Sequence, residues 1–299
     1  MAVQQTAVTA ASKLGRRQKA DRTRLTPSER TALWASRVFV WVVIVITMIP
    51  MWFVLTASFD PSNSYISVSF FPSNATLANY QTLFKGGQFL IWVKNTLIVG
   101  LVVSFAQVFI TALSAFAFSK LQFYGKKYGL MTLILLQMFP NFLAISAIYG
   151  ALAQLNMIDS LSSYTLIMLG TSAFNVWLLK GYLDSVPKEL DEAALIDGAN
   201  TWQRFLRIQL PLAMPMLVVI FLLTLVGVFG DYLMSGTILQ SPSNYTLAVG
   251  MYDLISKQFG KNWGEFAAAA LLSAVPLAVI FGLAQRYIAS GLVAGSVKG

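Results

Sequence analysis

The sequence of 299 residues contains no cysteine and no histidine. The missing cysteine excludes disulfides and thiolate nucleophiles, and the missing histidine removes imidazole acid–base chemistry and most zinc or haem sites. Charged residues make up only 11% of the chain, whereas soluble domains contain about 25%. Because 57% of the residues are hydrophobic, the composition predicts an integral membrane protein folded as one all-α bundle.

Six apolar runs are long enough to cross a hydrocarbon core of about 30 Å. They lie at about residues 34–58, 92–118, 130–152, 164–182, 212–234 and 265–288. We therefore expect a six-helix transmembrane domain over residues 34–290. Residues 1–33 predict a disordered basic tail, which lacks the short apolar core of a signal peptide, and residues 291–299 form a second short tail.

The basic residues are distributed unevenly between the two sides of the predicted membrane. Seventeen of the 21 lysines and arginines fall in the termini and in the loops on the same side as the termini, and four fall on the other side. The positive-inside rule then places both termini in the cytoplasm. The loops at about 59–91 and 235–264 would be external and could meet a partner there. Orientation and anionic lipid headgroups account for the net charge of +9 without nucleic acid as a partner.

A charged segment at about residues 183–211, here called the elbow, separates the fourth and fifth runs. Pro187 suits the first position of a short helix. Gly198 supplies the left-handed residue that ends this helix, and Asn200 or Thr201 can cap a second one. The sequence thus predicts two short helices held at the cytoplasmic membrane surface.

The second predicted helix has an apolar stripe formed by Trp202, Phe205 and Leu206, with the arginines away from it. Pro211 is expected to end or kink the backbone before the next run. A DNA-binding helix-turn-helix is the rival interpretation, but spans within a few residues of both ends would keep a duplex away. The elbow therefore suggests a surface for a cytoplasmic protein.

Two further observations concern nucleotide binding and the polar residues within the spans. The chain contains no Gly-rich run ending in Gly-Lys-Ser/Thr, so any ATP hydrolysis belongs to another chain. Gln137 and Asn141 lie four residues apart around Pro140 and share a helix face. Polar groups in spans face either a pathway or a neighbouring helix, and the sequence leaves both readings open.

The elbow carries an extended motif that resembles the signature of bacterial ABC importer permeases. It consists of Glu192-Ala193-Ala194, Gly198, Ile208 and Leu210-Pro211. The segments Tyr245–Met251, Trp263–Ala270 and Gly291–Gly299 look like those of the MalG-type subunits, the smaller permeases of maltose/maltodextrin importers. This resemblance covers nearly the whole chain after about residue 35.

The resemblance implies the type I ABC importer permease fold in a bacterial inner membrane. It implies four partners besides membrane lipid: a second homologous permease, two copies of a cytosolic ABC ATPase and an extracytoplasmic sugar-binding protein. ATP and magnesium would be bound by the ATPase, so this chain would hold no cofactor or metal, have no catalytic residues and not be an enzyme. The substrate would be maltose or maltodextrin, with trehalose or another di- or oligosaccharide as the alternative.

The resemblance also implies roles for particular residues. Those that would couple the elbow to the ATPase are Glu192, Ala193, Ala194, Asp197, Gly198, Ile208, Leu210 and Pro211. A loop that reaches the binding protein would include Met251, Tyr252, Lys257, Gln258 and Trp263. A C-terminal segment that contacts the ATPase would include Gly295, Val297, Lys298 and Gly299. Gln137 and Asn141 are the candidate pathway residues, and no sugar contact is assigned.

Two other classes of protein fit the sequence less well than an ABC permease. A stand-alone secondary transporter usually has internal repeats and ionisable residues within its spans, and this sequence shows no obvious repeat and almost no such residues. A membrane-bound enzyme would need a nucleophile with a nearby base, and the sequence offers neither histidine nor cysteine for that purpose.

Overall fold

The computed structural model describes residues 27–62, 70–71, 74–138, 141–256 and 262–294, and among these residues no strand occurs. The chain divides into two units, 1–53 and 54–299. Helix α2 (Pro27–Ser58) begins in the first unit. Its first turns include residues 27–33, which were expected in the basic tail. Pro27 presets a helical φ, and Glu29 in the first turn favours the helix N-terminus.

Five helices are long and apolar enough to cross a membrane. They are Pro27–Ser58, Gln88–Lys120, Leu161–Asp184, Thr201–Gly230 and Trp263–Gln285. Each corresponds to one of the predicted apolar runs and extends beyond it at one or both ends. The all-α membrane fold expected from the sequence is therefore confirmed.

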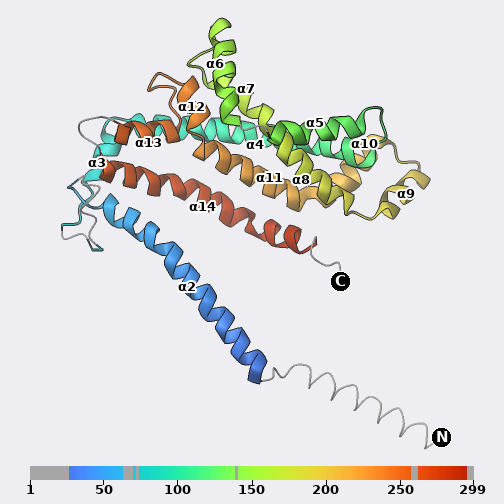
Figure 1. Cartoon of the computed structure of the whole chain (residues 1–299), viewed down its shortest axis with the longest axis horizontal. Coiled ribbons are helices and arrows are strands. Elements are labelled where there is room, and N and C mark those ends of the chain that lie inside the picture. Colours follow the sequence, from blue (N-terminus) through green and yellow to red (C-terminus); the bar gives the residue numbers. More distant parts are fainter. Residues whose placement is uncertain (1–26, 63–69, 72–73, 139–140, 257–261, 295–299) are drawn as a thin grey trace, which may run out of the picture. The chain divides into compact units, whose positions relative to one another are not determined.

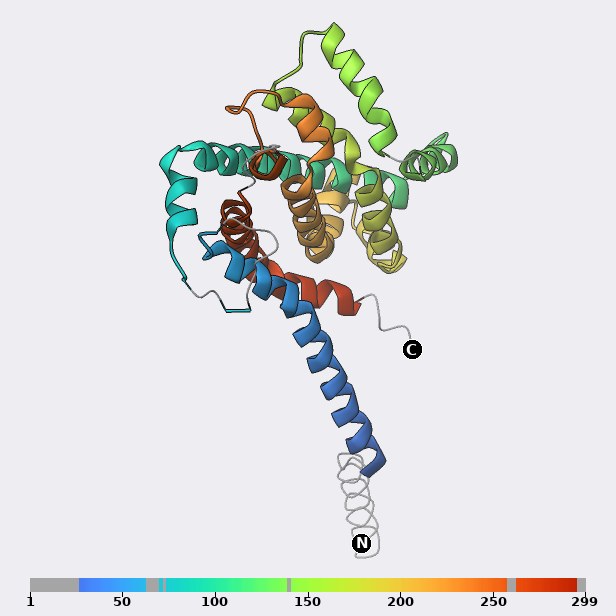
Figure 2. The ribbon, with the colours of Figure 1, turned by 60° about the vertical axis from the view of Figure 1, so that its left-hand side comes forward.

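The remaining predicted span, 130–152, is wrong as a continuous helix. The structure has α5 (Lys126–Met138), a short 3₁₀ turn η1 (Asn141–Ala144) and α6 (Ile145–Gln154). Figures 1 and 2 show α5 and α6 running in different directions. The sequence between them contains Pro140, and proline removes a backbone donor and clashes with the preceding turn.

The second unit is built around α4 (Gln88–Lys120) and α11 (Leu210–Gly230), which pack along each other. Helix α8 (Ala173–Asp184) packs on both of them, and α14 (Trp263–Ala294) packs on α11 (Figure 1). Helices α3 (Ala78–Lys85) and α13 (Leu247–Ser256) lie at one end. The elbow helices α9 (Lys188–Ile196) and α10 (Thr201–Arg204) lie at the other end.

Buried side chains form three apolar clusters along this unit. The cluster nearest the elbow contains Phe116, Leu183 and Phe205. A second joins Trp92 to residues of α11, α13 and α14. The third joins α4 and α11 to α6, α7 (Leu161–Leu169) and α12 (Leu233–Ile238). Because lipid is as apolar as these side chains, close packing supplies most of their stabilisation.

A buried polar network crosses the middle of the unit. Gln107 of α4 donates to the Met168 carbonyl at 2.7 Å and accepts from Asn175 Nδ2 of α8 at 2.7 Å. Thr224 of α11 donates to the same Gln107 amide oxygen at 3.2 Å. The Met168 carbonyl lies just before the 3₁₀ turn η2 (Gly170–Ser172), where the α7–α8 span deviates from α-helical geometry. Gln107 thus satisfies a backbone group next to the break, as the apolar interior requires.

Two glycines in the segments that carry the family resemblance allow close contacts. A Cβ on Gly250 of α13 would overlap the ring of Trp92, which is buried in α4. A Cβ on Gly264 of α14 would overlap the side-chain amide of Asn79 in α3. Asn79 Nδ2 in turn donates to the carbonyls of Ser58 and Asp60. Small residues at such positions let helices approach each other closely.

We expect Gly250→Ala to destabilise the second unit, because Trp92 has no room to move away from the added methyl group. Overpacking of this kind costs about 1–3 kcal/mol. Thermal unfolding of the purified protein in detergent should show a lower Tm. Gly86→Ala is the matched control, since no atom lies within 4 Å of its Cβ position. Equal Tm values for the two variants would contradict the packing argument.

Candidate functional site

Helix α9 is defined by its two ends. Pro187 was predicted at the first helical position, but it occupies the N-cap and the helix begins at Lys188. At the other end Gly198 has φ +77°. Its N–H donates to the Leu195 carbonyl at 3.1 Å, and that of Ala199 donates to the Ala194 carbonyl at 2.9 Å. This pair of bonds is a Schellman motif, which requires a left-handed residue, so the predicted role of Gly198 in ending the helix is confirmed.

The second elbow helix begins with a capping box. The Asn200 side chain accepts from the Gln203 N–H at 2.9 Å, and the Gln203 side chain accepts from the Asn200 N–H at 2.9 Å. The N-cap of this helix is therefore Asn200, and Thr201, the other predicted candidate, is its first helical residue.

Pro211 was expected to end or kink the backbone, and the structure shows that the helix does not end there. α10 continues through a π-helical turn, η3 (Phe205–Gln209), directly into α11. Pro211 lies at the start of α11, immediately after the π turn. Proline cannot donate to the preceding turn of a continuous helix and crowds that turn, and a π turn widens the helix locally, so the π turn accommodates Pro211. The elbow is thus one short helix followed by the first turns of a long span.

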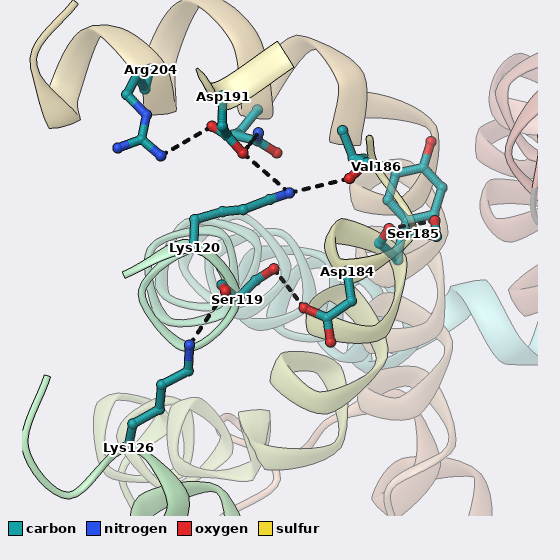
Figure 3. Close-up of polar contacts among 10 residues, drawn as sticks. Ser119, Lys120, Lys126, Asp184, Ser185, Val186, Asp191 and Arg204 are labelled. Carbon is teal, nitrogen blue, oxygen red and sulfur yellow. Dashed lines mark hydrogen bonds and ion pairs between the residues drawn. The ribbon is translucent and has the colours of Figure 1, made fainter. Parts of the chain in front are cut away.

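The buried carboxylate of Asp191 connects α9 to the second part of the elbow and to the end of α4 (Figure 3). Arg204 Nη2 lies 3.2 Å from one of its oxygens, and Gln209 Nε2 donates to the other at 2.9 Å. Lys120 Nζ, at the end of α4, lies 3.2 Å from the same second oxygen. The side chains of Lys120 and Asp191 are only 8% and 9% exposed. Removing either partner of so well desolvated an ion pair would leave the other charge buried and unpaired, so the pair holds these segments together.

Polar contacts next to this carboxylate join α4, α5 and α8. Ser119 Oγ donates to Asp184 at 2.7 Å, and Lys180 Nζ lies 2.6 Å from the same carboxylate. Lys126 Nζ donates to the carbonyls of Ser119 and Leu121 at 3.3 and 2.9 Å. Lys126 therefore caps the C-terminal end of α4, where a positive charge is favoured.

The outer surface of the elbow is part acidic and part apolar. Glu192, Ala193 and Asp197 are exposed, and Ile196 is 88% exposed. Ala194 is buried, so its small side chain serves packing within the chain instead of offering a surface to a partner. Ile208 and Leu210 are half-buried, and Pro211 is exposed.

The predicted division of the second elbow helix into an apolar stripe and outward arginines is partly wrong. Trp202 and Leu206 are exposed, whereas Phe205 is buried against Phe116. Arg204 is also buried, because Asp191 draws it inward, and only Arg207 among the two arginines is exposed.

The other predicted contact residues are only partly described. Met251 and Tyr252 lie on α13, where the Tyr252 ring stacks on Tyr232 at 4.3 Å between centroids, and Trp263 begins α14. Lys257, Gln258, Gly295, Val297, Lys298 and Gly299 lie outside the described residues. Gln137 belongs to α5 and Asn141 to η1, but their side chains also lie outside the described part of the structure.

Sequence reasoning missed the carboxylate of Asp159, which lies just before α7, at the end of the α7–α8 span opposite the elbow. Asp159 accepts from the backbone N–H groups of Gln240 and Ser241 at 2.8 and 2.9 Å, and from the Ser241 hydroxyl. Its pKa falls to about 2, because these hydrogen bonds outweigh the effect of burial, which acts in the opposite direction. The φ of Asp159 is +59°, a conformation that aspartate tolerates. Nothing in its sequence neighbourhood predicts a partner 80 residues away.

We expect Asp191→Asn to weaken the attachment of the elbow strongly. Lys120 and Arg204 would remain buried with no anionic partner, and losing one member of a buried ion pair costs about 3–5 kcal/mol. Tm in detergent should fall, and protease should cut the elbow faster. Asp197→Asn is the matched control, since Asp197 is exposed. If Asp191→Asn left both measurements unchanged, the carboxylate would not anchor the elbow.

Comparison with known proteins gives a consistent result across the chain. Residues 107–293 match the family described as "Binding-protein-dependent transport system inner membrane component". The galactooligosaccharides transport system permease protein GanQ of Bacillus subtilis (strain 168) is 40% identical over 230 residues, 75% of this chain and 81% of the relative. The maltose/maltodextrin transport system permease protein MalG of Vibrio vulnificus (strain YJ016) is 39% identical over 216 residues, 70% of this chain and 73% of the relative.

Solved structures support the same fold. A chain of a bacterial ABC transporter involved in the import of the acidic polysaccharide alginate superposes with a TM-score of 0.72 at 20% identity, over 88% of this chain and 99% of that chain. At this identity the likeness concerns the fold alone. The matched family region contains α8, the elbow and α11. The chain therefore belongs to the binding-protein-dependent transport system inner membrane components and has the fold of an ABC importer permease.

Proposed function

We propose that this chain is a permease subunit of an ATP-driven, binding-protein-dependent importer of oligosaccharides. The observation that carries the proposal is the similarity over most of the chain to curated permeases for such sugars. MdxG, the maltodextrin transport system permease protein of Bacillus subtilis (strain 168), is 40% identical over 225 residues. Maltose or maltodextrin is the first candidate substrate. Because GanQ, named for galactooligosaccharides, is equally similar, another di- or oligosaccharide is the second.

The complete transporter would contain a second homologous permease, two copies of a cytosolic ABC ATPase and an extracytoplasmic sugar-binding protein. ATP and magnesium would be held by the ATPase, and this chain would contribute no cofactor site. Both termini and the elbow would face the cytoplasm, as the basic residues favour.

The elbow would receive the movement of the ATPase. Its exposed acidic and apolar surface, with Glu192, Ala193 and Ile196, suits a cleft in a partner protein. Behind this surface, Asp191 binds Lys120 at the end of α4 and Arg204 at the start of the fifth span. A displacement of α9 would therefore move α4 and the fifth span together, as in rigid-body domain movements.

Secondary transport has less support. Asp231, which directly follows α11, accepts from Tyr164 Oη at 2.9 Å and from the Ser235 N–H at 3.0 Å. It therefore holds the start of α12 in place. A carboxylate committed to such structural bonds is poorly suited to bind and release a coupling ion.

Reconstitution tests the proposed function directly. The chain would be placed in liposomes with its candidate permease partner, ATPase and binding protein, and uptake of labelled maltotriose and of a galactooligosaccharide would be measured. We expect uptake that requires ATP and all four components, with one sugar preferred by at least about tenfold, equivalent to about 1.4 kcal/mol. Uptake by this chain alone under an ion gradient would contradict the proposal.

We also expect Glu192→Lys to uncouple the transporter. Reversing a charge at a docked surface should weaken ATPase recruitment or transport by about tenfold or more, while membrane insertion stays intact. Glu189→Lys is the matched control, because Glu189 is exposed on the same helix but outside the motif. Gly198→Val should act in the same direction as Glu192→Lys, because φ +77° is strained for a β-branched residue. Normal transport in both Glu192→Lys and Gly198→Val would show that the elbow does not couple.

A further inference from the structure

A cavity of about 550 Å³ lies between the elbow and the ends of the neighbouring spans. Its walls come from the end of α4, the start of α5, the end of α8 and one side of α9, together with Arg204. Five cationic side chains line it, namely Lys120, Lys126, Lys180, Lys188 and Arg204, against three acidic ones. The lining therefore has a net charge of +2.

The ion pairs within the lining leave part of this positive charge uncompensated. Lys180 is paired with Asp184. Lys120 and Arg204 share the single carboxylate of Asp191, so one positive charge remains there. Arg204 is 8% exposed, and its Nε has no hydrogen-bond partner among the described residues. A buried guanidinium donor without a partner is unfavourable unless another group satisfies it.

The remaining cations have no acidic partner in the described part of the chain. Lys126 Nζ donates only to two carbonyls, those of Ser119 and Leu121, and an ammonium group has a third proton to donate. Lys188 is exposed and makes no ion pair or side-chain hydrogen bond with another described residue. Figure 3 shows Lys120, Lys126 and Arg204 reaching this region from separate elements. The cavity thus gathers cationic donors from separate segments.

We propose that this cavity binds a phosphate-bearing anion and that its source is the headgroup of an anionic phospholipid. Phosphate oxygens accept from ammonium and guanidinium donors, and Arg favours them in particular. The position supports a lipid source, because Lys120 ends one span, Asp184 ends another and Lys126 starts α5. Basic pockets between membrane helices at this depth bind anionic headgroups. The site is independent of the sugar that the transporter carries.

A bound headgroup would add a link between α5 and α9 that the protein does not make by itself. Lys126 belongs to α5 and Lys188 to α9. One phosphate group that accepted from both ammonium groups would attach the first turn of α9 to α5. Lipid composition would then affect how firmly the elbow is held.

The test uses the purified full chain in a neutral detergent, titrated separately with short-chain phosphatidylglycerol, phosphatidylcholine and inorganic phosphate. We expect phosphatidylglycerol to raise Tm saturably by about 2–4 °C and phosphatidylcholine to have no effect. Native mass spectrometry should show one retained phosphatidylglycerol. If inorganic phosphate gave the same Tm rise at the same concentration, the site would bind a free anion and the lipid source would be wrong.

The variants separate the cavity from the general charge of the surface. Lys188→Gln changes a side chain that makes no ion pair or hydrogen bond with another described residue, so loss of folding would not obscure its effect. It should weaken the response to phosphatidylglycerol about tenfold or more. Adding Lys126→Gln should abolish the response. Lys127→Gln removes the same charge from an exposed neighbour outside the lining and should respond like the unmodified protein. An equal loss in Lys127→Gln, or no saturable response in the unmodified protein, would overturn the proposal.

Discussion

The buried carboxylate of Asp191 is the contact on which the geometry of the elbow depends. It binds Lys120 from α4 and Arg204 and Gln209 from the beginning of the fifth span. Three segments that are separate in the sequence are thereby held at one point close to the membrane surface. Because a buried charge without partners is costly, each of the three segments stabilises the position of the other two. The exposed face of α9 can therefore be held in place even though α9 is a short helix.

The outlines of the fold follow from the sequence because hydrophobic length is a strong signal. A run such as 212–234 leaves few alternatives to a membrane helix, and the elbow is marked by local chemistry that needs no tertiary contact. Gly198 and Asn200 act on their own helix ends through backbone groups a few residues away. Such features can be predicted from spacing alone.

The features that were missed depend on contacts between distant residues. Arg204 looked like a surface residue because its pairing with Asp191 is invisible in the sequence, and Asp159 gave no sign of its bonds to residues 240–241. Pro140 marks the break between α5 and α6 in the sequence. Whether a proline interrupts a membrane helix, however, depends on whether neighbouring groups bind the backbone groups that it leaves without a partner. The continuous helix through Pro211 shows the opposite case, in which a π turn accommodates a proline that suggested an end.

The bonds of Asp159 have a consequence for conditions outside the cell. In the proposed orientation this carboxylate lies on the external side. There its hydrogen bonds join the loop before α7 to the segment between α12 and α13. A carboxylate with a pKa of about 2 remains ionised in media of about pH 4 or 5, where an ordinary aspartate becomes partly protonated. The connection between these two segments would thus persist when the surroundings acidify.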